Sequence, residues 1–237
     1  MSILTEDSYR YELKFLLTEK KAEILKYRLS FVMEKDEFSV NPNGEYYIRS
    51  LYFDDVFNSG YYDKLDGVPE REKYRIRYYN FDDSFVTLEL KGKNKNLSYK
   101  KRDIITKDEC SLIINGDYDK IDVKDRSVLN DFINTSKRKG LKPAVLVDYS
   151  RIAYTYPYED VRITFDENIM SGKYNCDLFD QDIPLYNVLE DNNVILEVKY
   201  NNRLPSFLND VIKTVPMVRI AVSKFALCSE RKEGLYE

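Results

Sequence analysis

The sequence predicts an α+β fold in which an eight-stranded antiparallel β-barrel forms a tunnel with a charged lumen, flanked by helices. Three observations support this prediction. Aromatic residues, which favour strands, make up 14% of the 237 residues, and 21 of them are tyrosines. Strand-like segments outnumber helix-like segments and partly follow one another directly, which favours antiparallel pairing. One face of these strands is apolar, whereas the other repeats basic side chains.

The elements follow from the spacing of apolar residues along the chain. Segments with a period of two residues are predicted as strands at 9–17, 45–53, 73–79, 84–91, 97–105, 144–155, 161–165 and 193–200. Segments with a period of 3.6 residues are predicted as helices at 19–33, 56–65, 107–114, 126–139, 204–214 and 223–231. Thr18 and Thr106 are predicted N-caps, and Asn43-Gly44 is a predicted turn. Because no linker or internal repeat is evident, we expect one domain over residues 1–237.

Two kinds of short polar motif have competing interpretations. Residues 92–96 resemble a phosphate-binding loop, but they lack the GxxxxGK[ST] frame, so a hairpin turn is the better interpretation. The pairs Asp54-Asp55 and Asp82-Asp83 could bind a metal ion, although turns and helix caps use the same residues. We expect the turn and cap roles.

The composition excludes several classes of function. The chain has no histidine, which excludes Ser-His-Asp and Cys-His catalysis, histidine-ligated metals and a phosphohistidine intermediate. Its three cysteines form no CxxC pair, which excludes a structural zinc site and fits a reducing cytoplasm. A metal ion would have to be a hard one held by oxygen, Mn²⁺ or Mg²⁺. The sequence shows no membrane span and no signal peptide, and its net charge of −4 argues against nucleic-acid binding.

The alternation of charges within the predicted strands is the most informative feature. Along a strand, residues i and i+2 share a face. Lys73, Arg75 and Arg77 therefore share one face, and apolar or aromatic residues occupy the other. The motif Glu-x-Lys with an apolar middle residue occurs in three predicted strands, as Glu12–Lys14, Glu89–Lys91 and Glu197–Lys199.

Two architectures could produce this alternation. For one strand alone, a sheet with a solvated charged face is sufficient. For six strands, like charges on neighbouring strands are destabilising unless an anion lies between them. A barrel whose charged face lines the lumen explains the repetition better, and about eight strands leave room for one ligand. Such a lumen suits a polyanion with repeating charge, a triphosphate or polyphosphate.

The same residues carry a resemblance to a known family. The matching stretches run in order along the chain at 11–15, 48–54, 61–64, 75–78, 88–91, 100–102, 149–151, 196–199 and 223–225. In these stretches the sequence resembles the VTC-type polyphosphate polymerase domain of the triphosphate tunnel (CYTH-like) superfamily. The resemblance implies an ATP-dependent polymerase in which ATP enters a tunnel and polyphosphate grows there. ATP, triphosphate and polyphosphate are thus the expected partners.

The resemblance also implies roles for individual residues. The expected catalytic residues are Lys14, Arg75, Arg77, Lys91 and Arg151. The expected phosphate-binding residues are Arg49, Lys64, Lys100, Arg102, Tyr149, Arg162, Lys199, Ser223 and Lys224, of which Arg162 rests on alternation alone. Glu197 matches the metal-binding glutamate of the family, and Glu12 and Glu89 are further candidates to bind Mn²⁺ or Mg²⁺.

One departure from the pattern bears on the reaction. Hydrolytic tunnel enzymes typically carry an ExExK strand, whereas this strand begins with Arg10 in place of the first glutamate. Fewer carboxylates favour a polymerase over a triphosphatase, although a triphosphatase and a non-catalytic polyphosphate-binding module stay open as alternatives. Related eukaryotic proteins also carry an inositol-phosphate-binding domain and a membrane domain. We expect any translocation here to need a separate membrane partner.

Overall fold

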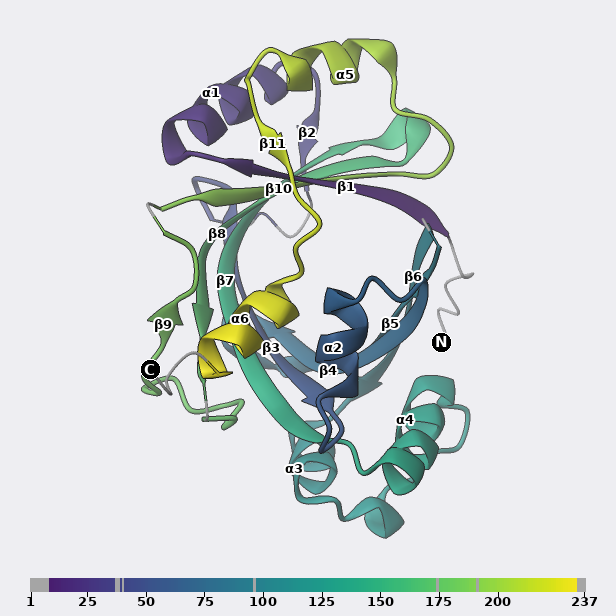
Figure 1. The fold of residues 1–237 in the computed structure, drawn as a ribbon. Coiled ribbons are helices and arrows are strands. Elements are labelled where there is room, and N and C mark those ends of the chain that lie inside the picture. The colour runs from purple at the N-terminus through teal and green to yellow at the C-terminus, as the bar shows by residue number, and fades with distance from the viewer. Residues whose placement is uncertain are drawn as a thin grey trace.

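A computed structural model describes residues 9–36, 39, 41–95, 97–173, 175–190 and 192–233 (Figure 1). The strands are β1 (Arg10–Leu17), β2 (Glu34–Lys35), β3 (Glu45–Asp54), β4 (Glu70–Tyr79), β5 (Asp82–Asn94), β6 (Leu97–Ile105), β7 (Lys142–Tyr156), β8 (Val161–Ser171), β9 (Tyr186–Asn187), β10 (Val194–Tyr200) and β11 (Val218–Arg219). The helices are α1 (Glu19–Leu29), α2 (Ser59–Leu65), α3 (Lys107–Asn115), α4 (Ser127–Lys139), α5 (Ser206–Lys213) and α6 (Lys224–Glu233).

The eight long strands form a closed antiparallel ring, which confirms the predicted fold. Their order is β7-β3-β4-β5-β6-β1-β10-β8, and pairing of β7 with β8 closes the ring. The ring is uneven, because β1 pairs along most of its length with β10 but meets β6 only at Arg10 and Tyr11. The short strands β2, β9 and β11, which the sequence did not predict, pair with the edges of β7, β8 and β1.

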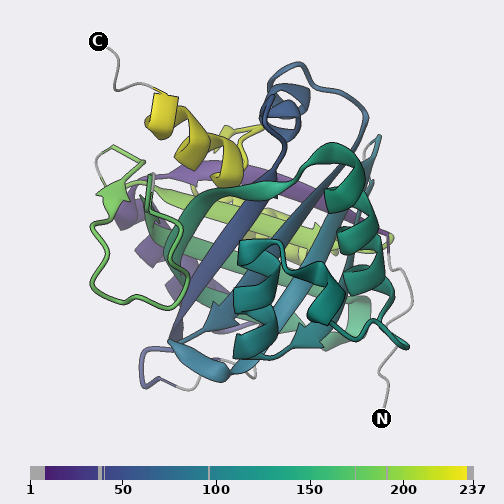
Figure 2. The same ribbon diagram turned by 90° about the horizontal axis from the view of Figure 1, so that it is seen from below.

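Helices cover the outside of the ring in two groups and also enter its inner curve (Figures 1 and 2). Helices α3 and α4 cover β4, β5 and β6, where Phe132 packs against the apolar face that includes Ile76 and Leu88. Helices α1 and α5 cover β1, β10 and β8 on another side. Helices α2 and α6 lie within the curve of β7, β3 and β4, and Phe225 of α6 belongs to a core with Tyr52 and Tyr149.

The helix boundaries follow from local capping. Thr106 forms the predicted N-cap of α3, because its hydroxyl accepts a hydrogen bond from the Glu109 N–H at 3.2 Å. Helix α2 begins at Ser59, later than the sequence predicts. The Asp54 carboxylate accepts hydrogen bonds from the N–H groups of Gly60 and Tyr61 and fixes that start.

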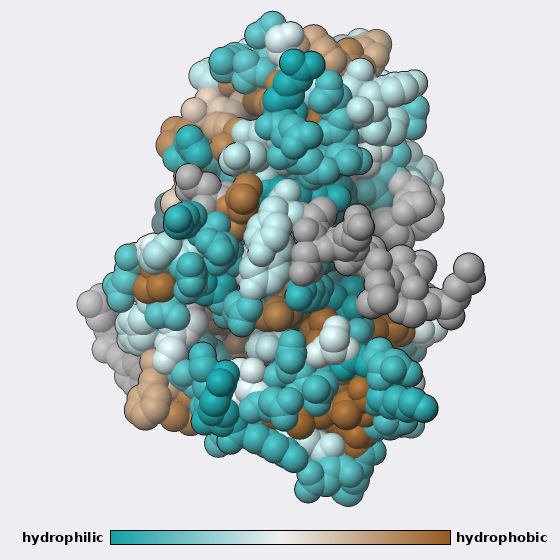
Figure 3. All heavy atoms as spheres, turned by 90° about the vertical axis from the view of Figure 1, so that its right-hand side faces the viewer, coloured by the Kyte–Doolittle hydropathy of each residue, from teal (hydrophilic) through white to brown (hydrophobic). Residues whose placement is uncertain are grey.

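The other short motifs also have structural roles. The Asp82 carboxylate accepts a hydrogen bond from the Ser84 N–H at 2.9 Å, which confirms its expected turn role. Residues 92–95 complete β5 and turn into β6, as the hairpin interpretation requires, although residue 96 lies outside the described residues. Along the described chain, none of the helices is long and apolar enough to cross a membrane. The face in Figure 3 is mainly hydrophilic, with hydrophobic residues in scattered patches.

Candidate functional site

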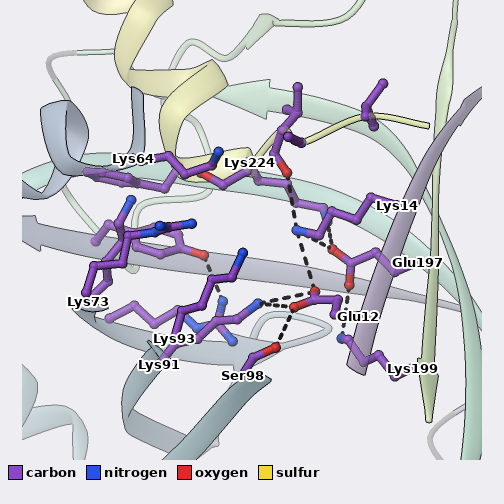
Figure 4. Close-up of a pocket in the computed structure, with 18 of the residues that line it drawn as sticks. Glu12, Lys14, Lys64, Lys73, Lys91, Lys93, Ser98, Glu197, Lys199 and Lys224 are labelled. Atoms are coloured by element: carbon purple, nitrogen blue, oxygen red, sulfur yellow. Dashed lines mark hydrogen bonds and ion pairs between the residues drawn. The ribbon is translucent and has the colours of Figure 1, made fainter. Parts of the chain in front are cut away.

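The ring encloses a cavity of about 470 Å³ with strongly cationic walls (Figure 4). Its lining comes from β1, β3, β4, β5, β6, β7, β10 and α2, and from the stretch from Arg219 of β11 into α6. Two of the described lining residues are acidic, Glu12 and Glu197. Twelve are basic: Lys14, Lys64, Arg71, Lys73, Arg75, Arg77, Lys91, Lys93, Arg151, Lys199, Arg219 and Lys224. The charged lumen expected from the alternation is therefore present.

Strand β4 supplies two arginines whose guanidinium groups are held by hydroxyl groups. The Arg77 Nε donates to Ser50 Oγ at 2.9 Å, and its NH2 group donates to the Tyr149 hydroxyl at 3.0 Å. The Arg75 NH1 group donates to the Tyr52 hydroxyl at 2.7 Å. These hydroxyl groups orient both guanidinium groups. Arg75 also pairs with the Glu89 carboxylate, which lies 3.9 Å from the Arg77 NH1 group.

A layer of buried carboxylates lies behind the cations. Glu89 is fully buried and accepts from Arg75 Nε at 2.7 Å and from Lys100 Nζ at 3.2 Å. Burial alone would raise the pKa of Glu89, but Arg75, Lys100 and Arg77 hold it well below its usual range. Glu89 therefore stays ionised. It does not line the cavity and pairs with Arg75 and Lys100, a position that does not support its expected metal-binding role.

Asp166 of β8 is a second buried counter-ion. It is fully buried, and its carboxylate contacts Arg151 through two hydrogen bonds and Lys224 through an ion pair. Burial opposes its ionisation, yet Arg151 and Lys224 lower the pKa of Asp166. Asp166 was not among the site residues expected from the sequence.

Among the described residues, Glu12 and Glu197 are the carboxylates that line the cavity, and Lys14 lies between them. The Lys14 Nζ is 3.5 Å from Glu12 Oε1 and 3.2 Å from Glu197 Oε1. Lys224 and Lys199 contact the two oxygens of Glu197 at 3.2 Å and 3.0 Å. Burial would raise the pKa of both carboxyl groups, but the surrounding cations lower it, so both are ionised at neutral pH.

These two carboxylates fit a hard divalent cation. Within the described part of the chain, no group of three or more His, Cys, Asp or Glu residues is placed to hold a metal ion. Mg²⁺ is commonly bound through one or two carboxylates together with substrate phosphates. Glu12 and Glu197 supply that number of carboxylates from adjacent strands, β1 and β10. The donor set suits Mn²⁺ or Mg²⁺ bound jointly with a phosphate ligand.

The start of α6 adds polar groups at one side of the cavity. Ser223 Oγ accepts a hydrogen bond from the Ala226 N–H at 3.1 Å, so Ser223 caps the helix. Ser223, Lys224 and Phe225 all line the cavity, as do the expected Lys64 of α2 and Tyr149 of β7. A helix N-terminus directed at a cavity favours an anion there.

Four expected phosphate-binding residues do not line the cavity. Arg49 lies on the outer face of β3 and is 1% exposed, with its NH2 group 2.9 Å from Asp148 Oδ2. Arg49 therefore forms a buried ion pair outside the cavity, a position that does not support its expected phosphate-binding role. Arg162 faces the ring interior but pairs with Asp36 at 2.7 Å. Lys100 is held by Glu89, and Arg102 is exposed opposite Glu89 in the strand register.

Several basic residues of the wall had no role assigned from the sequence. Lys73 was placed on the same face as Arg75 and Arg77 but was not named as a site residue, and Arg71 continues that face along β4. Lys93 likewise continues the face of Lys91 on β5, so the period of two residues would have identified both Arg71 and Lys93. Arg219 lies on the two-residue strand β11, which is too short to show any alternation.

Comparison with known proteins identifies the family. The family model described as "VTC domain" matches residues 9–231. The chain belongs to the VTC domain family. No curated protein matches this VTC domain in sequence.

The VTC domain is also similar to several solved structures. The fold described above follows from the strand order and pairing alone. The PH1819 protein from Pyrococcus horikoshii OT3 shares 16% identity with a TM-score of 0.48, covering 94% of this chain and 99% of that one. A putative adenylate cyclase from Bacillus halodurans shares 14% identity with a TM-score of 0.49, covering 89% of each chain. The Pct1 RNA triphosphatase of Schizosaccharomyces pombe shares 10% identity with a TM-score of 0.35, covering 90% of this chain and 78% of that one.

Proposed function

We propose that this VTC domain is an ATP-dependent polyphosphate polymerase, a metal-dependent phosphotransferase that moves the nucleotide γ-phosphate onto a growing polyphosphate chain. The observation that carries the proposal is the cavity itself, whose described lining has twelve basic and two acidic residues. A chain of phosphates is a ligand whose charge repeats along its length, as the charge of this wall does. Membership of the VTC family supports the same substrate class.

The basic residues of the cavity wall can meet the two requirements that phosphoryl transfer places on a protein. Such transfers depend on positioning the groups and on stabilising negative charge, with little covalent chemistry by the protein. Arg77 and Arg75 can grip phosphate oxygens with two parallel hydrogen bonds, whereas Lys14 and Lys91 supply point charges. The terminal phosphate of the acceptor is already ionised at neutral pH, so a chain without histidine can use it as the nucleophile.

Mn²⁺ or Mg²⁺ is the proposed cofactor. Glu197 and Glu12 would hold it, and when bound it would neutralise charge on the bridging phosphate oxygens. Lys14 contacts both carboxylates and would keep them close together while a phosphate chain approaches. Lys199 contacts Glu197, and burial lowers its pKa to about 7, so part of its population is neutral at physiological pH.

The acceptor distinguishes polymerase from triphosphatase. Hydrolysis needs an activated water, and the only two carboxylates among the described lining residues both bind lysine ammonium groups. Within the proposal, residues 1–237 act as one cytoplasmic domain that binds no nucleic acid. A separate membrane partner would receive the product.

Product analysis tests the proposal. The purified protein is incubated with γ-labelled ATP and Mn²⁺, and the products are separated on a gel. A ladder of lengthening chains supports the polymerase, free phosphate alone supports a triphosphatase, and binding without turnover supports a binding module. The control variant Arg138→Ala, on the exposed face of α4, should give the wild-type pattern.

A further inference from the structure

Five of the twelve basic residues of the described wall form no ion pair with a described residue; four of them come from α2, β4 and β5, and the fifth, Arg219, comes from β11. Most of the described wall cations contact a carboxylate, as Lys14 contacts Glu197. Lys64, Arg71, Lys73 and Lys93, here called the unpaired cluster, form no ion pair with any described residue, although Figure 4 shows the three lysines lining the same pocket as the paired ones. No carboxylate of the described residues lies within ion-pair distance of these four groups.

The strand register brings these charges face to face. Arg71 of β4 lies directly opposite Lys93 of β5, and Lys73 lies directly opposite Lys91. Like charges directly opposite on adjacent strands are destabilising. A sheet that keeps two such pairs side by side within a cavity gains stability when an anion lies between them.

Within the unpaired cluster, Lys73 has the ammonium group that its surroundings stabilise least. Its Nζ is buried without a hydrogen-bond partner in the described structure and lies 4.0 Å from the centre of the Phe225 ring. Burial, together with the charges of Arg71, Lys64 and Lys91, lowers the pKa of Lys73 to about 7. Asp54 acts in the opposite direction but forms no ion pair with it.

We propose that the unpaired cluster is an anion subsite at which Lys73 takes up a proton from solvent when a phosphate chain binds. The proposal rests on the proposed function, because it assumes a phosphate chain in this cavity. Bound phosphate oxygens supply both the hydrogen-bond acceptor and the counter-charge that the ammonium group of Lys73 lacks. No covalent bond changes, and the proton balance is one proton from solvent to Nζ.

The size of the effect follows from the charge state of the free protein. At pH 7.5, about one-quarter of a lysine with a pKa of about 7 is charged, so full protonation takes up about three-quarters of a proton. The affinity for the phosphate chain should then fall by about five-fold between pH 7 and pH 8, because the neutral form becomes dominant. A permanently charged residue at position 73 would remove this dependence.

Calorimetry measures the proton directly. Inorganic triphosphate is titrated into the metal-free full chain at pH 7.5, in buffers that differ in ionisation enthalpy, and the slope gives the number of protons taken up. The matched variant Lys73→Arg keeps a positive charge at every pH used. Lys73→Met keeps a side chain of similar length without a charge. It replaces Lys73→Arg as the comparison if the larger arginine side chain disrupts folding. Protons taken up by the ligand, by Lys100 and by Lys199 contribute equally in all three proteins. They therefore cancel when the proton numbers of the wild type and the variants are compared.

The outcomes separate this inference from the proposed function. We expect the wild type to take up about three-quarters of a proton more than either variant, and Lys73→Met to bind more weakly. Equal proton numbers in the wild type and Lys73→Arg would overturn the inference and leave the polymerase proposal standing. A wild type that does not bind triphosphate at all would overturn both.

Discussion

Glu89 offers a strong test of how the cationic wall stays folded. Glu89 is a buried counter-ion of Arg75 and Lys100 and is not among the residues that line the cavity. The substitution Glu89→Gln keeps the shape of the side chain and removes its charge. Removing one partner of a buried ion pair costs about 3–5 kcal/mol of unfolding free energy, since the remaining charge is left uncompensated. For a chain of this size the melting temperature should fall on the order of 10 °C.

The assay is thermal unfolding followed by circular dichroism, with Asp83→Asn as the matched control. Asp83 also pairs with a lysine, Lys107, at 2.7 Å, but both side chains are about half exposed. We expect the control to melt close to the wild type, because solvent screens exposed pairs. If Glu89→Gln melts as high as Asp83→Asn, the buried-counter-ion reasoning is wrong.

The pH dependence of the same variant has a definite sign. The pKa of Glu89 is well below its ordinary value of 4.5, so the ionised group contributes its full stabilisation above about pH 4.5. The contribution is lost as the pH falls toward the depressed pKa. The difference in melting temperature between wild type and Glu89→Gln should therefore be constant from pH 6 to pH 8 and should narrow below about pH 4.5. A gap that widens in acid would contradict this assignment.

Three further predictions concern the cavity and its mouth. Arg77→Ala should lose ATP turnover by orders of magnitude. Its melting curve should stay near that of the wild type, because the main partners of Arg77 are the neutral hydroxyls of Ser50 and Tyr149. Wild-type turnover in this variant would mean that β4 does not present this face to the substrate. Glu197→Gln should lose turnover but keep triphosphate affinity in calorimetry, since the lumen loses one negative charge; equal loss of both would make Glu197 purely structural. Gly92→Ala should lower the melting temperature, because a Cβ there would lie 2.0 Å from the Tyr99 ring, and the double variant Gly92→Ala/Tyr99→Ala should recover part of the loss.

The sequence could predict the fold only where the two faces of a strand differ clearly in polarity. On β4 the basic residues Arg75 and Arg77 alternate with apolar ones, so the inward face was assigned correctly. On β3 both faces are largely apolar, because Tyr46 and Ile48 face one way while Leu51 faces the other. The phase of β3 was therefore undetermined, and Arg49 was placed in the lumen by mistake.

The candidate site needed a second kind of information, the register between strands. Glu89 and Lys91 belong to the same Glu-x-Lys motif, yet Glu89 is covered by Arg75 and Lys100 while Lys91 stays at the cavity. Asp166 became relevant only because β8 brings it against Arg151. Periodicity within one strand cannot reveal partners that come from its neighbours.

The central claim is that the ring interior binds a phosphate chain. A crystal structure of the protein with inorganic triphosphate tests it most directly, because the phosphorus positions identify the residues that bind them. We predict a bound chain inside the ring, with oxygens in contact with Arg77, Lys14 and Lys91. Triphosphate bound only at the outer surface, for instance on the exposed basic end of α4 at Lys137–Lys139, with no phosphate density inside the ring, would contradict it.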